Sequence, residues 1–204
     1  MSRMMRWGLL VLGLMMSLWS GSAKAEAQYG YQTATLAVSA TARVNVSVNV
    51  PRIILLRVGA SNTTIDTVTF SMTASIPATP TTATVGNNQN VNWDGTSVPT
   101  FSSGTSDLAA AAWTNVASAT LSCSVAAFAP AGGPVNTALT ATDVTPAGLT
   151  HPVCGYPGAG TPTAIAAFGV VKTSTFRYTL SGAGASTWAP GSYSTQVTYT
   201  ASAP

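Results

Sequence analysis

Charged residues are scarce in this chain, since Lys, Arg, Asp and Glu together make up 6% of its 204 residues. The formal net charge is +3, but three basic residues lie within the first 25 positions, and residues 26–204 carry as many acidic as basic side chains. Proteins that bind nucleic acids need clustered Lys and Arg to displace counterions from the phosphates. The sequence contains no such cluster, so it excludes a nucleic-acid-binding function.

Groups that could catalyse a reaction near neutral pH are also few. No G-x-S-x-G or other nucleophile motif accompanies the single histidine, His151, so we expect it to be an exposed loop residue. The acidic residues lie far apart and form no calcium-binding motif, and a glycosidase site would require folding to bring two of them together. We expect no enzyme, no bound metal and no cofactor, and a hydrolase ranks third among the functions considered.

The sequence contains one long apolar run, Trp7–Trp19. It follows Arg3 and Arg6 and precedes the stretch SGSAKA. The alanines at positions 23 and 25 match the A-x-A pattern that signal peptidase accepts, so residues 1–25 are predicted to be a secretory signal peptide. The run is shorter than the roughly 20 residues of a membrane-spanning helix. We therefore expect no transmembrane segment after cleavage, and an uncleaved N-terminal anchor is the alternative.

Cysteine occurs only twice, at Cys123 and Cys154. In an exported chain such a pair predicts a structural disulfide, and closing a loop of about 30 residues stabilises a fold by roughly 3 to 4 kcal/mol. Reduced or metal-bound thiols remain the alternative, because His151 lies nearby in sequence. Against that alternative, the pair lacks the C-x-x-C spacing of many metal sites.

Apolar and polar residues alternate over long stretches of the sequence. In TLAVSATARVNVSVNV, residues 35–50, every even position is apolar, which is the pattern of a strand with one buried face. One strand of this length would measure roughly 50 Å, far beyond the usual five or six residues. We therefore predict an N-terminal extension over residues 26–42, a first core strand over Val44–Val50, and a β-sandwich domain over residues 43–204.

Similar runs recur along the chain between stretches rich in Gly and Pro. The expected strands are RIILLRV, TIDTVTFSMTASI, NVNW, ATLSCSVAAF, ALTATDV, IAAFGVV, TFRYTL and SYSTQVTYTA. The first is nearly continuous, so we expect it to be buried on both faces or to pass from one sheet to another. Many short strands separated by turns predict an all-β, antiparallel β-sandwich.

One segment departs from this pattern, SDLAAAAWTNVAS at residues 106–118. Ser106 or Asp107 could cap an Ala-rich helix there. The poor helix formers Thr114, Asn115 and Val116 would limit it to about three turns. We therefore expect at most one short helix.

Two tryptophans in loops, Trp93 and Trp188, allow two interpretations. We expect them to cap the ends of the sandwich core, because large aromatic side chains contribute much of the core energy of small β domains. The alternative is that their rings are exposed and form a platform for carbohydrate.

The C-terminal residues read WAPGSYSTQVTYTASAP, a Pro-Gly turn followed by an alternating strand. Together with the alternating N-terminal segment, the signal peptide and the single disulfide, this arrangement resembles the subunits of chaperone-usher pili. In that family each subunit is an incomplete immunoglobulin-like sandwich that lacks one strand. A periplasmic chaperone fills the gap first, and the N-terminal extension of the next subunit then fills it by β-strand addition.

The resemblance implies roles for particular residues. The side chains that would fill the groove of a neighbouring subunit are those of Ala34, Leu36, Val38, Ala40 and Ala42. The strand that borders the groove and contacts the chaperone would carry Gly191, Tyr193, Val197 and Tyr199.

The expected function is that of a structural subunit of a pilus or fimbria-like polymer. Such a subunit would be exported to the periplasm and would assemble with its own copies at the cell surface. Its partners would be a periplasmic chaperone and an outer-membrane usher. The alternative is a self-sufficient secreted or surface β-sandwich module that binds carbohydrate or matrix through Trp93 and Trp188.

Overall fold

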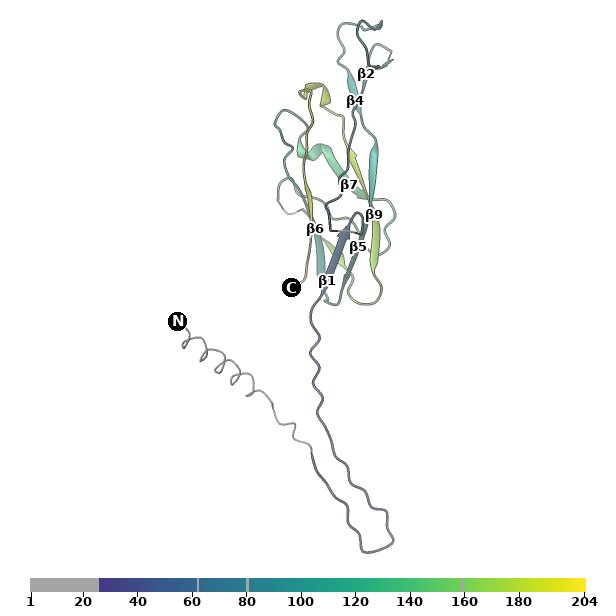
Figure 1. Cartoon of the computed structure of the whole chain (residues 1–204), viewed down its shortest axis with the longest axis vertical. Coiled ribbons are helices and arrows are strands. Elements are labelled where there is room, and N and C mark those ends of the chain that lie inside the picture. Colours follow the sequence, from purple (N-terminus) through teal and green to yellow (C-terminus); the bar gives the residue numbers. More distant parts are fainter. Residues whose placement is uncertain (1–25, 62, 80, 159) are drawn as a thin grey trace, which may run out of the picture. The chain divides into compact units, whose positions relative to one another are not determined.

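The computed structural model describes residues 26–61, 63–79, 81–158 and 160–204 (Figure 1). The predicted signal peptide, residues 1–25, lies outside the described residues. The chain divides into two units, one ending at Val50 and one spanning Pro51–Pro204. Each unit is therefore considered by itself.

The first unit contains no strand in its described part, residues 26–50, and every residue there is exposed. Its backbone doubles back, so that a Cβ atom on Gly30 would lie 2.6 Å from the carbonyl oxygen of Ser39. The predicted core strand over Val44–Val50 is wrong for this structure. An alternating sequence forms a strand only when a neighbouring backbone pairs with it, and these residues have no ladder partner.

The second unit is all-β, and its sheets are antiparallel throughout. A four-stranded sheet has the order β1 (Ile54–Val58), β5 (Thr105–Thr114), β9 (Lys172–Leu180), β7 (Leu139–Asp143). A three-stranded sheet has the order β10 (Val197–Ser202), β6 (Ala119–Val125), β8 (Thr163–Ile165). The predicted β-sandwich class is confirmed, since side chains from both sheets form one core.

A second three-stranded sheet, with the order β3 (Thr81–Thr82), β2 (Thr73–Ile76), β4 (Thr100–Ser102), lies at one end of this unit (Figure 1). Two short 3-10 turns complete the regular structure, η2 (Asn136–Ala138) and η3 (Ala185–Thr187). Most expected strands form, at least in part. In contrast, NVNW forms none, and IAAFGVV contributes only its first residue, Ile165, to β8.

The predicted helix over residues 106–118 is wrong, because most of this segment is strand β5. Its side chains alternate between the core and the outer face, and Ala110, Ala112 and Thr114 are buried. Pairing with β1 on one side and β9 on the other satisfies its backbone along most of its length. The intrinsic helix preference of alanine is small compared with these tertiary contacts.

RIILLRV forms β1, but it is an edge strand with one face in solvent, so the prediction of burial on both faces is wrong. Ile54, Leu56 and Val58 turn toward the core, whereas Leu55 and Arg57 are exposed. The strand also remains in one sheet and pairs with β5 over its full length.

Candidate functional site

One side of the sandwich is bordered by two edge strands, β1 of the four-stranded sheet and β10 of the three-stranded sheet. These strands contact each other. Among the described strands, β1 pairs only with β5, and β10 pairs only with β6. Each therefore presents a row of free backbone N–H and C=O groups, to which a further strand could add.

The inward-facing side chains along this side are only half-buried, although they pack against the core. They are Ile54, Leu56 and Val58 on β1, and Val197, Tyr199, Ala201 and Ala203 on and just after β10. On the neighbouring strand β6, by contrast, every inward-facing side chain is buried. The core is therefore incompletely covered where β1 and β10 meet.

A shallow groove of about 260 Å³ lies at one end of this side, where β1 begins and β10 ends. The Arg52 guanidinium beside it donates a hydrogen bond to the carbonyl oxygen of Pro204. The groove is lined mainly by apolar groups, from Arg52, Ile53, Ile54, Val116, Ala201, Ser202 and Ala203. With no acid or histidine in this lining, its chemistry suits apolar side chains of an extended peptide.

The residues predicted for the groove strand divide into two groups. Val197 and Tyr199 lie on β10, as expected. Gly191 and Tyr193 precede the strand, and the Tyr193 hydroxyl donates to the Ala189 carbonyl oxygen at 2.6 Å. The Pro-Gly turn therefore ends later than the sequence pattern indicated, because the chain first packs along Gly133 and pairs through Ser194.

The predicted donor side chains all belong to the first unit and are all exposed: Ala34, Leu36, Val38, Ala40 and Ala42. Their role stays a prediction. The structure adds that the valines at positions 44, 46, 48 and 50 are exposed as well, so the whole alternating stretch is free to pair with another chain.

The two tryptophans have different environments. Trp188 packs against the core, as expected. Trp93 lies between β3 and β4 with 55% of its surface exposed, so its predicted role as a core cap is wrong. Its indole N–H donates to the Ser97 carbonyl oxygen at 2.8 Å, in a turn organised by the Asp94 carboxylate. Only Trp93 keeps the exposed ring that carbohydrate binding would need.

A cluster of buried side chains lies inside the sandwich around His151. The prediction that His151 is an exposed loop residue is therefore wrong. The His151 Nε2 atom lies 2.7 Å from the Tyr199 hydroxyl oxygen, which lies 2.9 Å from that of Tyr178. The imidazole also packs edge-on against Phe176, with ring centroids 4.5 Å apart. The loop between β7 and β8 enters the core here because its Cys154 is bound to β6.

The predicted disulfide between Cys123 and Cys154 is present. It joins β6 to the same loop that carries His151. The Asp143 carboxylate at the end of β7 holds the other side of the loop, accepting hydrogen bonds from the His151 backbone N–H at 2.8 Å and from the Ser174 hydroxyl at 2.7 Å. The covalent bond and the carboxylate together fix the imidazole in place.

Burial determines the ionisation of this cluster. It lowers the pKa of His151 below the ordinary value of 6.5, and the opposing effect of the Asp143 charge is smaller. Burial also raises the pKa of Tyr199 and of Tyr178 above the ordinary value of 10.0. The imidazole and both phenols are therefore neutral at neutral pH.

This predicts a loss of stability in mild acid. Because the pKa of His151 is lower in the folded chain than in the unfolded chain, its stabilising effect is complete above about pH 6.5 and is lost as the pH falls below that value. Urea unfolding of a chain beginning at Pro51 should show a lower free energy of unfolding at pH 5 than at pH 7. His151→Gln should flatten this dependence, and equal pH dependence in both chains would contradict the assignment.

The sequence did not indicate several residues of the groove and of the His151 cluster. The alternation of Tyr199, Ala201 and Ala203 was visible, but it could not show that β1 would be the facing strand. The partnership of His151 with Tyr178 and Tyr199 joins residues from β9, β10 and a loop, and no local pattern signals it. The only local signal for the inward turn of this loop is the closeness of His151 to Cys154 in sequence.

Comparisons with known proteins do not identify a family for this chain. No protein-family model matches the chain, and no curated protein or solved structure shows significant similarity to it. Among the described residues, no helix is both long and apolar enough to cross a membrane.

Proposed function

We propose that this protein is a structural subunit of a surface polymer, of the pilus or fimbria kind, in which each copy donates a β-strand to the next. The observation that carries the proposal is the open side of the sandwich between β1 and β10. There, two free strand edges flank half-buried apolar side chains and a groove lined mainly by apolar groups.

The N-terminal stretch supplies a matching donor. Residues 35–50 alternate apolar and polar side chains, and none of them is paired in a strand. In β-strand addition, backbone hydrogen bonds provide affinity, and alternate side chains enter the groove. An exposed strip of this kind would promote aggregation unless a receiving edge covers it. A second copy of the same chain offers such an edge.

Two further features favour an exported polymer over a freely diffusing protein. A disulfide persists in an oxidising compartment, and the chain contains one. Its low content of charged residues favours association. The proposed route is export behind the signal peptide, then capture by a periplasmic chaperone at the same open side, and finally assembly by an outer-membrane usher at the cell surface.

The first test removes the proposed donor. Mature chain beginning at Glu26 should form polymers visible by electron microscopy, whereas a chain beginning at Pro51 should remain monomeric. The deletion leaves the whole second unit intact, so its circular dichroism should still report β-structure. Polymers formed equally well by both chains would contradict strand donation.

The same preparation distinguishes the polymer subunit from the second candidate function, a self-sufficient carbohydrate-binding module. The exposed ring of Trp93 favours that function. A mature chain that stays monomeric, binds glycans and loses that binding in Trp93→Ala would support the module and contradict the polymer.

A further inference from the structure

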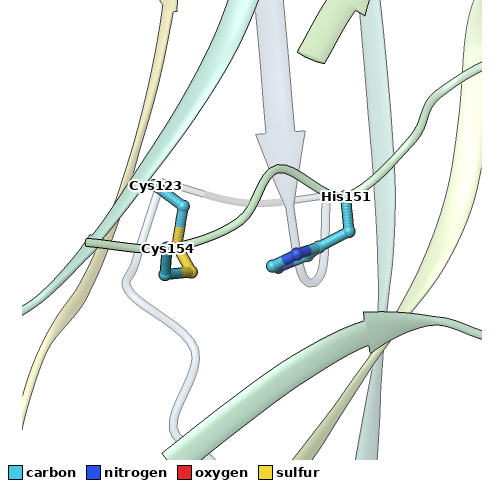
Figure 2. A group of neighbouring side chains, drawn as sticks. All are labelled: Cys123, His151 and Cys154. Carbon is cyan, nitrogen blue, oxygen red and sulfur yellow. A yellow bond between two sulfur atoms is a disulfide. The ribbon is translucent and has the colours of Figure 1, made fainter. Parts of the chain in front are cut away.

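The disulfide and His151 bring together three side chains of the kinds that bind metal ions. The two sulfur atoms and an imidazole nitrogen all lie within 4.8 Å of one another. All three residues are buried: Cys123 is 2% exposed, Cys154 is 8% exposed and His151 is 9% exposed. Figure 2 shows the imidazole ring pointing from the β7–β8 loop toward the disulfide. No other group of this kind occurs among the described residues.

In the oxidised protein each sulfur is bonded to the other, so neither is a thiolate. A dithiol reductant would convert the disulfide to two thiols while itself being oxidised to a disulfide. A bound metal would then displace one proton from each thiol. We propose that the reduced chain binds one Zn²⁺ ion through the thiolates of Cys123 and Cys154 and the imidazole of His151.

The donor set suits this ion. Zn²⁺ binds Cys thiolates and His nitrogen in a tetrahedral arrangement, and three protein ligands with a water in the fourth position form a known type of site. Two thiolates neutralise the charge of the ion, which lowers the cost of burying it. The Asp143 carboxylate, hydrogen-bonded to the His151 backbone N–H, adds negative charge nearby.

The imidazole is already prepared as a ligand. Its Nε2 atom lies 2.7 Å from the Tyr199 hydroxyl oxygen, and this contact holds the ring in one orientation. Partners of this kind fix the orientation of a ligating histidine, so Tyr199 is a positioning residue.

The test uses the full mature chain, oxidised or reduced, with Zn²⁺ titrated by calorimetry and Co²⁺ as a spectroscopic substitute. We expect the reduced chain to bind one ion, with the absorption of tetrahedral thiolate-bound Co²⁺, and the oxidised chain to bind none. His151→Asn leaves both cysteines in place and should weaken binding more than about 100-fold, since even outer partners of a ligand contribute about 10- to 100-fold. Tyr199→Phe should weaken binding by about 10- to 100-fold.

Two outcomes would overturn the proposal. One is equal affinity of the reduced wild-type chain and of His151→Asn, which would mean that the histidine is no ligand. The other concerns folding: if reduction alone removes the near-ultraviolet circular dichroism of the core, Zn²⁺ should restore it in the wild-type chain. Failure of Zn²⁺ to restore that signal would show that the three donors do not form a site.

Discussion

Replacing Ala201 by Asp should abolish polymer formation by the mature chain. Ala201 lies on β10 with its side chain facing the proposed groove, and it is one of the residues that line it. A carboxylate there would lose its hydration when a donor strand covers it, at a cost of several kcal/mol. We expect subunit association to weaken at least about 100-fold, since each 1.4 kcal/mol is a factor of ten.

The matched control is Thr200→Asp, which places the same charge one residue away on the exposed outer face of β10. It should polymerise like the wild-type chain. Ala203→Asp repeats the test further along the groove, in case Ala201→Asp disturbs the pairing of β10 with β6. Normal polymers from both groove variants, with their circular dichroism unchanged, would show that this side of the sandwich receives no strand.

The largest loss of stability is expected from Phe176→Ala. Phe176 is 0% exposed on β9 and packs between both sheets, with ring centroids 4.5 Å from His151 and 5.5 Å from Tyr199. Truncating a buried phenylalanine leaves a cavity, so the free energy of unfolding should fall by about 3 to 5 kcal/mol. Urea unfolding of the chain beginning at Pro51 measures this without interference from polymers.

Phe168→Ala is the control for this measurement, because Phe168 is 61% exposed in the loop after β8. Its free energy of unfolding should change by no more than about 0.5 kcal/mol. Similar losses in the two variants would mean that the His151 cluster does not lie at the centre of the core.

The fold class followed from sequence because alternation along β6, β9 and β10 is a direct consequence of one buried face. The same reasoning failed for β5, whose run of alanines has a helical preference that pairing on both edges overrides. It failed again for Val44–Val50, since periodicity shows that a segment can form a strand but does not show whether a partner strand is present.

The candidate site was only partly accessible to sequence reasoning. The pairing of Cys123 with Cys154 was predictable, because a sequence with two cysteines has one possible internal bridge. The burial of His151 was not, because it results from contacts with Tyr199 and Phe176, which are distant in sequence. The groove likewise exists only because β1 and β10 end their sheets on the same side.

The most direct test of strand donation is to return the donor to the chain beginning at Pro51 as a separate peptide. A synthetic peptide of residues 32–50 should raise the thermal midpoint of that chain in a concentration-dependent manner, equivalent to about 2.7 kcal/mol at 100 times its dissociation constant. A control peptide with Asp at positions 36, 38, 40, 44, 46 and 48 should have no effect. An unchanged midpoint with the native peptide at all concentrations would contradict the account.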